Sequence, residues 1–199
     1  MNDLSLRPGV TAALGLDGAD PAPAVLASLG PEAGLTVLPP EPLLEPSLTM
    51  WQNYRLVKRF SPPEKGEALA RLLELSGLKT QGWDRTFRKD MDGERQLWKL
   101  MLTLAMSRGR VFLPRALEGL SGVQRERLDA MLAAWTEEGR AAVLTAGTVK
   151  EALALSSVRQ LWLVRGERVL PLDRASAEAC PEEETEEKRT EALWKEAER

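Results

Sequence analysis

Histidine is absent from this chain of 199 residues, and cysteine occurs once, at Cys180. Histidine is the commonest general base at neutral pH and the commonest metal ligand, so neither role can be filled in the usual way. A single cysteine cannot close an internal disulfide, and we expect Cys180 to be an incidental reduced thiol. These absences exclude histidine-based catalysis and an internal disulfide framework.

Long apolar runs and a strong positive charge are missing as well. No apolar run approaches the roughly 18 residues of a membrane span, and residues 1–3 show neither the basic flank nor the apolar stretch of a signal peptide. The net charge is −3, which gives no basic footprint for a nucleic acid. We expect a cytoplasmic protein that binds no nucleic acid and does not insert into the membrane.

The composition is that of an ordinary soluble globular protein, 43% hydrophobic and 29% charged. The length fits one domain with a tail. Residues 181–199 hold eight glutamates against four lysines and arginines, a net charge of −4, which leaves +1 for the rest. We expect a solvated helix or a disordered tail at this end.

Short apolar segments alternate with helix-prone segments along the body of the chain. Strands are predicted at 10–14, 35–38, 110–113, 141–145, 160–164 and 168–172. Helices are predicted at 22–29, 47–60, 64–76, 94–107, 124–135 and 148–155. Asp20 is placed to cap the first helix ahead of Pro21, and Gly30 to end it. The alternation predicts an α/β sandwich with a mostly parallel sheet.

Four segments carry motif-like residues in a fixed order. Residues 15–23 fall on the pattern GxxGxGK[ST]T, and residues 90–96 resemble the LSGGERQ signature. Residues 111–121 resemble the strand that ends in Asp-Glu-Pro with its D-loop, and residues 143–147 the strand before a switch histidine. Asp90 and Pro114 are 24 positions apart, and Pro114 and Gly147 are 33 apart. In this order and spacing, residues 4–172 resemble an ATP-binding-cassette (ABC) ATPase.

The resemblance implies a P-loop NTPase-like, three-layer α/β sandwich with a mostly parallel sheet. It places an ABC ATPase-like domain at 1–173, with a small helical subdomain at about 46–92, and a charged tail or helix at 174–199. Fourteen residues precede Gly15, which leaves no room for the strands and the aromatic residue that hold adenine in this family. The antiparallel subdomain is therefore expected to be reduced.

The phosphate loop of the resemblance lacks the groups that bind phosphate. The lysine position is Pro21, and the following hydroxyl positions are Ala22 and Pro23. A phosphate loop works through backbone N–H groups and its lysine, and a proline has no N–H to donate. The last glycine of the loop is Asp20, an anion where the anionic ligand would lie. We expect no cofactor at Gly15, Gly18, Asp20 and Pro21.

The positions that the resemblance assigns to catalysis are also altered. The two acidic positions are Pro114 and Arg115, the glutamine-loop position is Pro40, and the histidine position is Gly147. Phosphoryl transfer needs a carboxylate for magnesium and a group that orients water, and an arginine can do neither. We expect no catalytic residue and no metal site.

The signature-like segment keeps Gly93, Glu94, Arg95 and Gln96, with Met91 at the serine position. It could contribute weakly to the site of a partner subunit, or it could simply start a helix with Asp92 as the N-cap. Residues 120–125, Leu-Ser-Gly-Val-Gln-Arg, match the signature more literally. We place them in the D-loop and the next helix, because the alternative leaves too little chain for the later histidine strand and hairpin.

The aromatic residues allow two interpretations. Exposed aromatics would indicate a docking surface, whereas buried ones would fill the core. Both interpretations apply to Trp51, Tyr54, Phe60 and Trp83, which could form a docking surface for the membrane subunit, as the resemblance implies, or fill the core of the helical subdomain. Core positions are expected for Trp98, Trp135 and Trp162. Trp194 could anchor the tail to the body or to a partner.

The leading hypothesis is a non-catalytic ABC ATPase-like subunit, a pseudoenzyme that acts through protein contacts. Its partner would be another ABC-type ATPase subunit, a membrane permease or a second copy, in the cytoplasm or peripheral at the inner face of the membrane. The alternative is an ATP-binding transporter subunit whose missing groups come from a partner chain, with ATP and magnesium as cofactors. A third possibility is an unrelated α/β scaffold with similar spacing.

Overall fold

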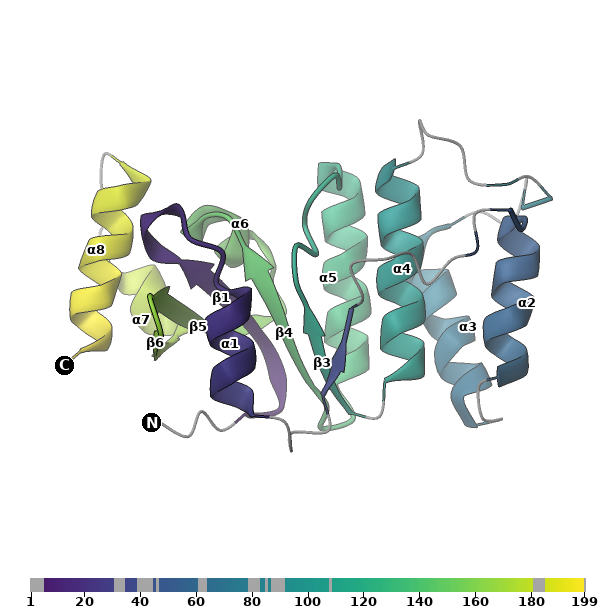
Figure 1. Cartoon of the computed structure of the whole chain (residues 1–199), viewed down its shortest axis with the longest axis horizontal. Coiled ribbons are helices and arrows are strands. Elements are labelled where there is room, and N and C mark those ends of the chain that lie inside the picture. Colours follow the sequence, from purple (N-terminus) through teal and green to yellow (C-terminus); the bar gives the residue numbers. More distant parts are fainter. Residues whose placement is uncertain are drawn as a thin grey trace.

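One sheet of six strands, in the order β2-β3-β4-β1-β5-β6, organises the chain (Figure 1). The computed structural model describes residues 6–30, 35–38, 45, 47–60, 64–78, 83–84, 86, 92–107, 109–180 and 185–198. The strands are β1 (Gly9–Gly15), β2 (Thr36–Val37), β3 (Arg110–Leu113), β4 (Ala141–Ala146), β5 (Val158–Arg165) and β6 (Arg168–Asp173). All neighbouring strands are parallel except β5 and β6, which form a hairpin.

The helices cover both faces of the sheet. They are α1 (Ala22–Leu29), α2 (Met50–Phe60), α3 (Glu64–Ser76), α4 (Asp92–Met106), α5 (Gly122–Thr136), α6 (Val149–Ala154), α7 (Arg174–Ala179) and α8 (Glu186–Ala197). Successive strand residues point to opposite faces. Leu14 of β1 therefore joins the core cluster that includes α4 and α5, whereas Ala13 joins Val25 of α1 on the other face. The predicted three-layer α/β sandwich with a mostly parallel sheet is confirmed.

The central strands are shielded on all sides. In β1 the residues from Gly9 to Leu14 are buried, and every residue of β4 is buried. Such continuous apolar strands are typical of parallel sheets covered by helices on both faces. At the outer edge, Pro171 of β6 lies opposite Trp162 of β5.

Helices α2, α3 and α4 extend away from the sheet, at the end of the molecule opposite α8 (Figure 1). Helices α3 and α4 pack against α5, which connects this helical part to the sheet. Trp98 of α4 is fully buried and lies 4.8 Å, centroid to centroid, from Trp83. The core positions expected for Trp98, Trp135 and Trp162 are confirmed by their burial.

The predicted boundaries of the helices and strands agree with the structure to within a few residues. The predicted bounds of β3 and α1 match the structure. Helix α4 begins at Asp92, two residues earlier than predicted, so Asp92 lies in the first turn and is not the N-cap. Ser121 caps α5 through a reciprocal pair of hydrogen bonds with Gln124, so α5 begins at Gly122, two residues earlier than predicted. Within the described parts of the chain, no helix combines the length and apolar character that crossing a bilayer requires.

The acidic end of the chain forms a helix, one of the two expected outcomes, but one side of this helix is buried and not solvated. Helix α8 buries Leu193 and Trp194 against the body of the protein. The guanidinium groups of Arg165 and Arg168 lie 4.7 and 5.4 Å from the centroid of the Trp194 ring. Arg165 also pairs with Glu191. The charged side chains of α8 lie mainly on its outer face, and Leu193 and Trp194 on its inner face pack into the core.

Replacement of Trp194 with alanine should lower the free energy of unfolding by about 3 kcal/mol, because a large cavity forms under two arginines. Urea unfolding followed by far-UV circular dichroism measures this change. Lys195→Ala is the matched control, because Lys195 is the exposed neighbour on the same helix. Equal stabilities of the two variants would contradict the packing described for α8.

Asp129 of α5 holds the turn that precedes β5. Its carboxylate accepts hydrogen bonds from the N–H and the hydroxyl of Ser156 (2.8 and 2.6 Å) and from the N–H of Ser157 (2.9 Å). Burial raises the pKa of this carboxyl, but the serine hydrogen bonds outweigh burial and hold the pKa below its ordinary value. The stability that the charged form contributes is therefore present above the unfolded pKa, about 3.9, and is lost as the pH falls through the folded pKa.

Asp129→Asn should lower the free energy of unfolding at neutral pH by about 1 kcal/mol, because the half-exposed carboxylate loses charge-assisted hydrogen bonds. The difference from the unsubstituted protein should shrink below about pH 4, where protonation removes the same contribution. Denaturant titrations across this range test the trend, with Glu126→Gln on the exposed side of α5 as the control. A difference that does not change with pH would argue against a role for the charge.

Candidate functional site

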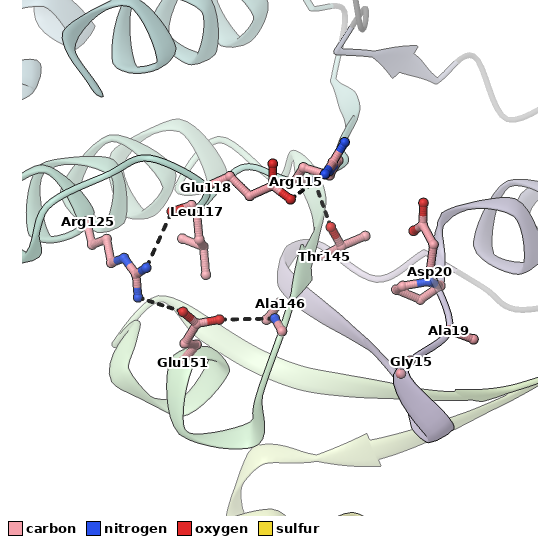
Figure 2. Close-up of a pocket in the computed structure, with 13 residues that line it drawn as sticks. Gly15, Ala19, Asp20, Arg115, Leu117, Glu118, Arg125, Thr145, Ala146 and Glu151 are labelled. Atoms are coloured by element: carbon pink, nitrogen blue, oxygen red, sulfur yellow. Dashed lines mark hydrogen bonds and ion pairs between the residues drawn. The ribbon is translucent and has the colours of Figure 1, made fainter. Parts of the chain in front are cut away.

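The loops that follow β1, β3 and β4 meet at one edge of the sheet (Figure 2). Because these strands are parallel, their carboxyl ends lie together, which is where open α/β sheets usually bind ligands. The loops enclose a pocket of about 560 Å³. The residues that line it are Gly15, Gly18, Ala19, Asp20, Pro21, Arg115, Leu117, Glu118, Arg125, Thr145, Ala146, Gly147 and Glu151.

The loop after β1 folds back tightly on itself. A short 3-10 turn, η1 (Leu16–Gly18), follows Gly15, and Gly18 has a positive φ of 71°. The carbonyl oxygen of Ala19 comes so close to Gly15 that a Cβ added there would lie 1.8 Å from it. Only glycine fits at the end of β1 in this conformation. The loop therefore places a carbonyl oxygen against the first glycine of the phosphate-loop-like segment.

Asp20 lies one residue before the N-cap of the helix that follows this loop. Its Oδ1 accepts a hydrogen bond from the N–H of Ala22 at 2.9 Å. Pro21 takes the N-cap position itself, one residue later than predicted, and its carbonyl accepts from the N–H of Val25 at 3.0 Å. The start of α1 thus has an internal anion close to its positive dipole end. Pro21 and Pro23 have no N–H to donate at this helix start.

Arg115, immediately after β3 and Pro114, has a left-handed backbone. Its φ is 55°, which is uncommon for a residue with a side chain. Its N–H donates to Thr145 Oγ1 at 2.7 Å, and its carbonyl accepts from Gln96 Nε2 at 3.3 Å. Its guanidinium donates to Glu118 at 2.6 Å, in an exposed ion pair (Figure 2). Neighbours on β4 and α4 hold this conformation from both sides.

A second ion pair closes the other side of the pocket. Glu151 of α6 accepts from Arg125 Nη1 at 2.9 Å through Oε1. Through Oε2 it accepts from the N–H of Gly147 at 3.1 Å. Arg125 also donates to the carbonyl of Leu120 at 3.2 Å. The guanidinium and the backbone N–H that could face a ligand are thus both used within the protein.

The charged residues that line the pocket have a small negative net formal charge. Three lining residues are acidic (Asp20, Glu118 and Glu151) and two are basic (Arg115 and Arg125), a net charge of 2 − 3 = −1. Each arginine pairs with one of the glutamates. Among the described lining residues none is a lysine or a histidine. The lining of this pocket therefore has no excess of positive charge.

The predicted site residues separate into two groups. Gly15, Gly18, Asp20 and Pro21 line the same pocket as Arg115 and Gly147, as their motif positions imply. The signature-like residues Gly93, Glu94, Arg95 and Gln96 lie in the first turns of α4, outside the pocket lining. A Cβ at Gly93 would lie 2.5 Å from Gln124 Oε1, so this segment packs closely against the start of α5. Pro40 and Met91 lie outside the described residues.

Sequence reasoning did not single out four polar lining residues: Thr145, Glu118, Arg125 and Glu151. Thr145 was visible only as one residue of an apolar strand. Arg125 and Glu151 are 26 positions apart, and no local pattern links them. Glu118 is three residues after Arg115, and this short spacing was the one available signal. Within the described chain, no group of three or more histidine, cysteine or acidic residues is arranged to hold a metal ion.

Comparisons with known proteins find the fold and no sequence relative. No protein-family model matches the sequence, and no curated protein matches it. Among solved structures, an "ATP binding subunit of ABC transporter" aligns with a TM-score of 0.65 and 17% identity, over 86% of this chain and 81% of that chain. A protein assigned as a cobalt transport ATP-binding protein aligns with a TM-score of 0.63 and 14% identity, over 87% and 72%. The chain therefore has the fold of ABC transporter ATP-binding subunits.

Gly15→Ala should destabilise the protein by about 3 kcal/mol, because the new methyl group overlaps the Ala19 carbonyl and the loop must move. Gly18→Asn is the matched control: a positive φ suits asparagine, and no atom lies within 4 Å of a Cβ at that position. It should cost less than about 1 kcal/mol. Thermal unfolding of both variants provides the comparison. Similar losses at the two positions would contradict the close approach at Gly15.

Proposed function

We propose that this chain is a non-catalytic subunit with an ABC ATPase-like fold that acts through protein–protein contacts. The observation that supports this most strongly is the loop after β1. Its first glycine faces a carbonyl oxygen, and Asp20 accepts a hydrogen bond at its helix start. A phosphate cradle presents N–H groups and a cation at these positions, so the pocket offers a nucleotide the wrong charges.

The same pocket does not fit hydrolysis. Magnesium-assisted phosphoryl transfer needs a carboxylate for the ion and a group that orients water. The two residues after β3 are Pro114 and Arg115, and the Arg115 guanidinium would repel a cation. The nearby carboxylates of Glu118 and Glu151 are each engaged by an arginine. We therefore assign ATP and magnesium no role in this chain, and no catalytic or metal-binding residue.

The partners that suit this proposal are other subunits of a transporter complex, or of a complex derived from one. The structures with the same fold are described as transporter ATP-binding proteins. We propose that the chain pairs with another ABC-type ATPase subunit, with a membrane permease or with a second copy. It would work in the cytoplasm or at the inner face of the membrane, without inserting into it.

The competing proposal keeps nucleotide binding and takes the missing groups from a partner chain. The signature-like residues of α4 are the feature that could take part in such a shared site. The two proposals differ in one measurable property. If the chain acts through protein contacts only, it should bind no nucleotide with or without a partner. If it shares a nucleotide site with a partner, binding should appear when the partner is added.

Purified protein should give no calorimetric signal with ATP and magnesium at millimolar concentration, because the pocket carries a net negative charge and lacks a lysine. The assay also includes the steady-state release of phosphate. Magnesium-dependent ATPase activity that disappears in Gly18→Asn, a variant expected to stay folded, would contradict the proposal. Binding that depends on an added ABC-type subunit would favour the competing one.

A further inference from the structure

Helix α2 has a buried side that fixes it firmly to the helical part. Met50, Asn53 and Tyr54 are buried. The side-chain amide of Asn53 donates to the carbonyl of Glu45 at 3.1 Å and accepts from the N–H of Glu45 at 2.8 Å. Tyr54 lies 5.6 Å from Trp83, centroid to centroid, within a group of aromatic rings. The described apolar residues on this side of the helix are therefore already used in the core.

The opposite side of α2 exposes an unusual combination of side chains. Among the described side chains of α2, five are exposed, and at about 100° per residue they cover an arc of about 140°. We call this arc the α2 outer face; it consists of Trp51, Arg55, Arg59, Gln52 and Leu56, in angular order. Trp51 is 38% exposed and Leu56 is 44% exposed. The arginines lie between the two apolar residues, so a cationic stripe has an apolar border on each side.

The Trp51 ring packs against neighbouring side chains of the helical part. Its ring stacks on Tyr54 at 5.4 Å with an interplanar angle of 6°, and it lies 5.5 Å from Trp83. The guanidinium of Arg55 lies 5.5 Å from the Trp51 centroid. An ordered tryptophan beside an arginine is the composition that dominates binding energy at protein interfaces. Little side-chain entropy would be lost when it is covered.

The charge of α2 indicates what would cover it. Residues 50–60 include three basic residues and no acidic residue, in a chain whose net charge is −3. An interface with this face would need negative groups over the arginine stripe and apolar groups at its two borders. A helix with an acidic stripe bordered by apolar residues has that pattern.

A lipid surface fits this face less well. A helix that lies in a membrane interface needs a contiguous apolar side that sinks into the bilayer. Among the described side chains of α2, the apolar Met50 and Tyr54 face the core, and the exposed Trp51 and Leu56 are separated by arginines. The Trp51 ring is also occupied by Tyr54 and Arg55.

We propose that the α2 outer face docks an acidic, amphipathic helix of a protein partner. This inference rests on the proposed function, because it names the chemistry of a contact through which a non-catalytic subunit would act. Trp51 and Leu56 are the apolar anchors, and Arg55 and Arg59 select for acidic side chains. The face lies on α2, at the end of the molecule opposite α8 (Figure 1).

The test uses the full chain and a synthetic helical peptide of about 18 residues, or five turns, with a glutamate stripe between two rows of leucine. A control peptide carries lysine in place of each glutamate. Nuclear magnetic resonance titration should give chemical-shift changes centred on residues 50–60 with the acidic peptide and not with the basic one. The double variant R55E/R59E should bind the acidic peptide at least about tenfold more weakly.

The matched control is K150E/K195E, which makes the same change in net charge at two exposed lysines outside α2. It should bind the acidic peptide within about twofold of the unsubstituted protein if the effect is local. Trp51→Ala, which removes an apolar anchor without changing charge, should also weaken binding. Equal binding of both peptides, shifts outside α2, or equal losses in the two charge variants would overturn the proposal.

Other occupants would give different results. A doubled mass in light scattering that returns to the monomer value in R55E/R59E would identify a second copy as the occupant and overturn the proposal. Binding to phosphatidylserine vesicles, with no binding to the acidic peptide, would do the same in favour of a membrane. If the acidic peptide does not bind, the result of the ATP titration of the pocket is not affected. Nucleotide binding in that titration would contradict the proposed function and leave the peptide result standing.

Discussion

The contact between the Ala19 carbonyl and Gly15 determines how the rest of the candidate site is arranged. Because the loop after β1 turns back within a few residues, the chain enters α1 close to the end of the strand, and Asp20 lies beside the N–H of Ala22. The helix start then has its own anion. In the neighbouring loops, the backbone N–H groups of Arg115 and Gly147 and the guanidinium of Arg125 also have hydrogen-bond partners within the protein. The pocket lies where open α/β sheets usually bind ligands. Its polar groups, however, largely form hydrogen bonds with one another.

Arg115 shows how these internal hydrogen bonds are maintained. A left-handed backbone with a side chain is a strained conformation that persists only when its surroundings hold it. Here Thr145 holds the amide, Gln96 holds the carbonyl, and Glu118 holds the guanidinium. These partners come from β4, from α4 and from the loop itself. The strained residue therefore connects the helical part of the molecule to the edge of the sheet.

Much of the fold could be predicted from the sequence, because short apolar strands and amphipathic helices have distinct periods. The order of weak motifs placed Gly15, Asp20 and Arg115 around one pocket, which the structure confirms. The pairing of Arg125 with Glu151 could not be predicted, because it depends on the tertiary approach of α5 and α6. The sequence allowed Trp194 to anchor the acidic segment to the body, and the structure confirms this. That Leu193 is buried beside it could not be predicted, because glutamates dominate the composition of α8. The functional meaning of the altered motif positions remains a prediction.

The two outer strands restrict how this protein can meet another chain. At one edge, Pro171 removes a backbone donor from the middle of β6, and at the other edge β2 consists of two residues. An incoming strand would find an interrupted hydrogen-bond ladder at the first edge and too short a template at the second. Extension of the sheet by a foreign strand is thus disfavoured on both sides. Recognition of this molecule is left to the side chains of its helices and loops.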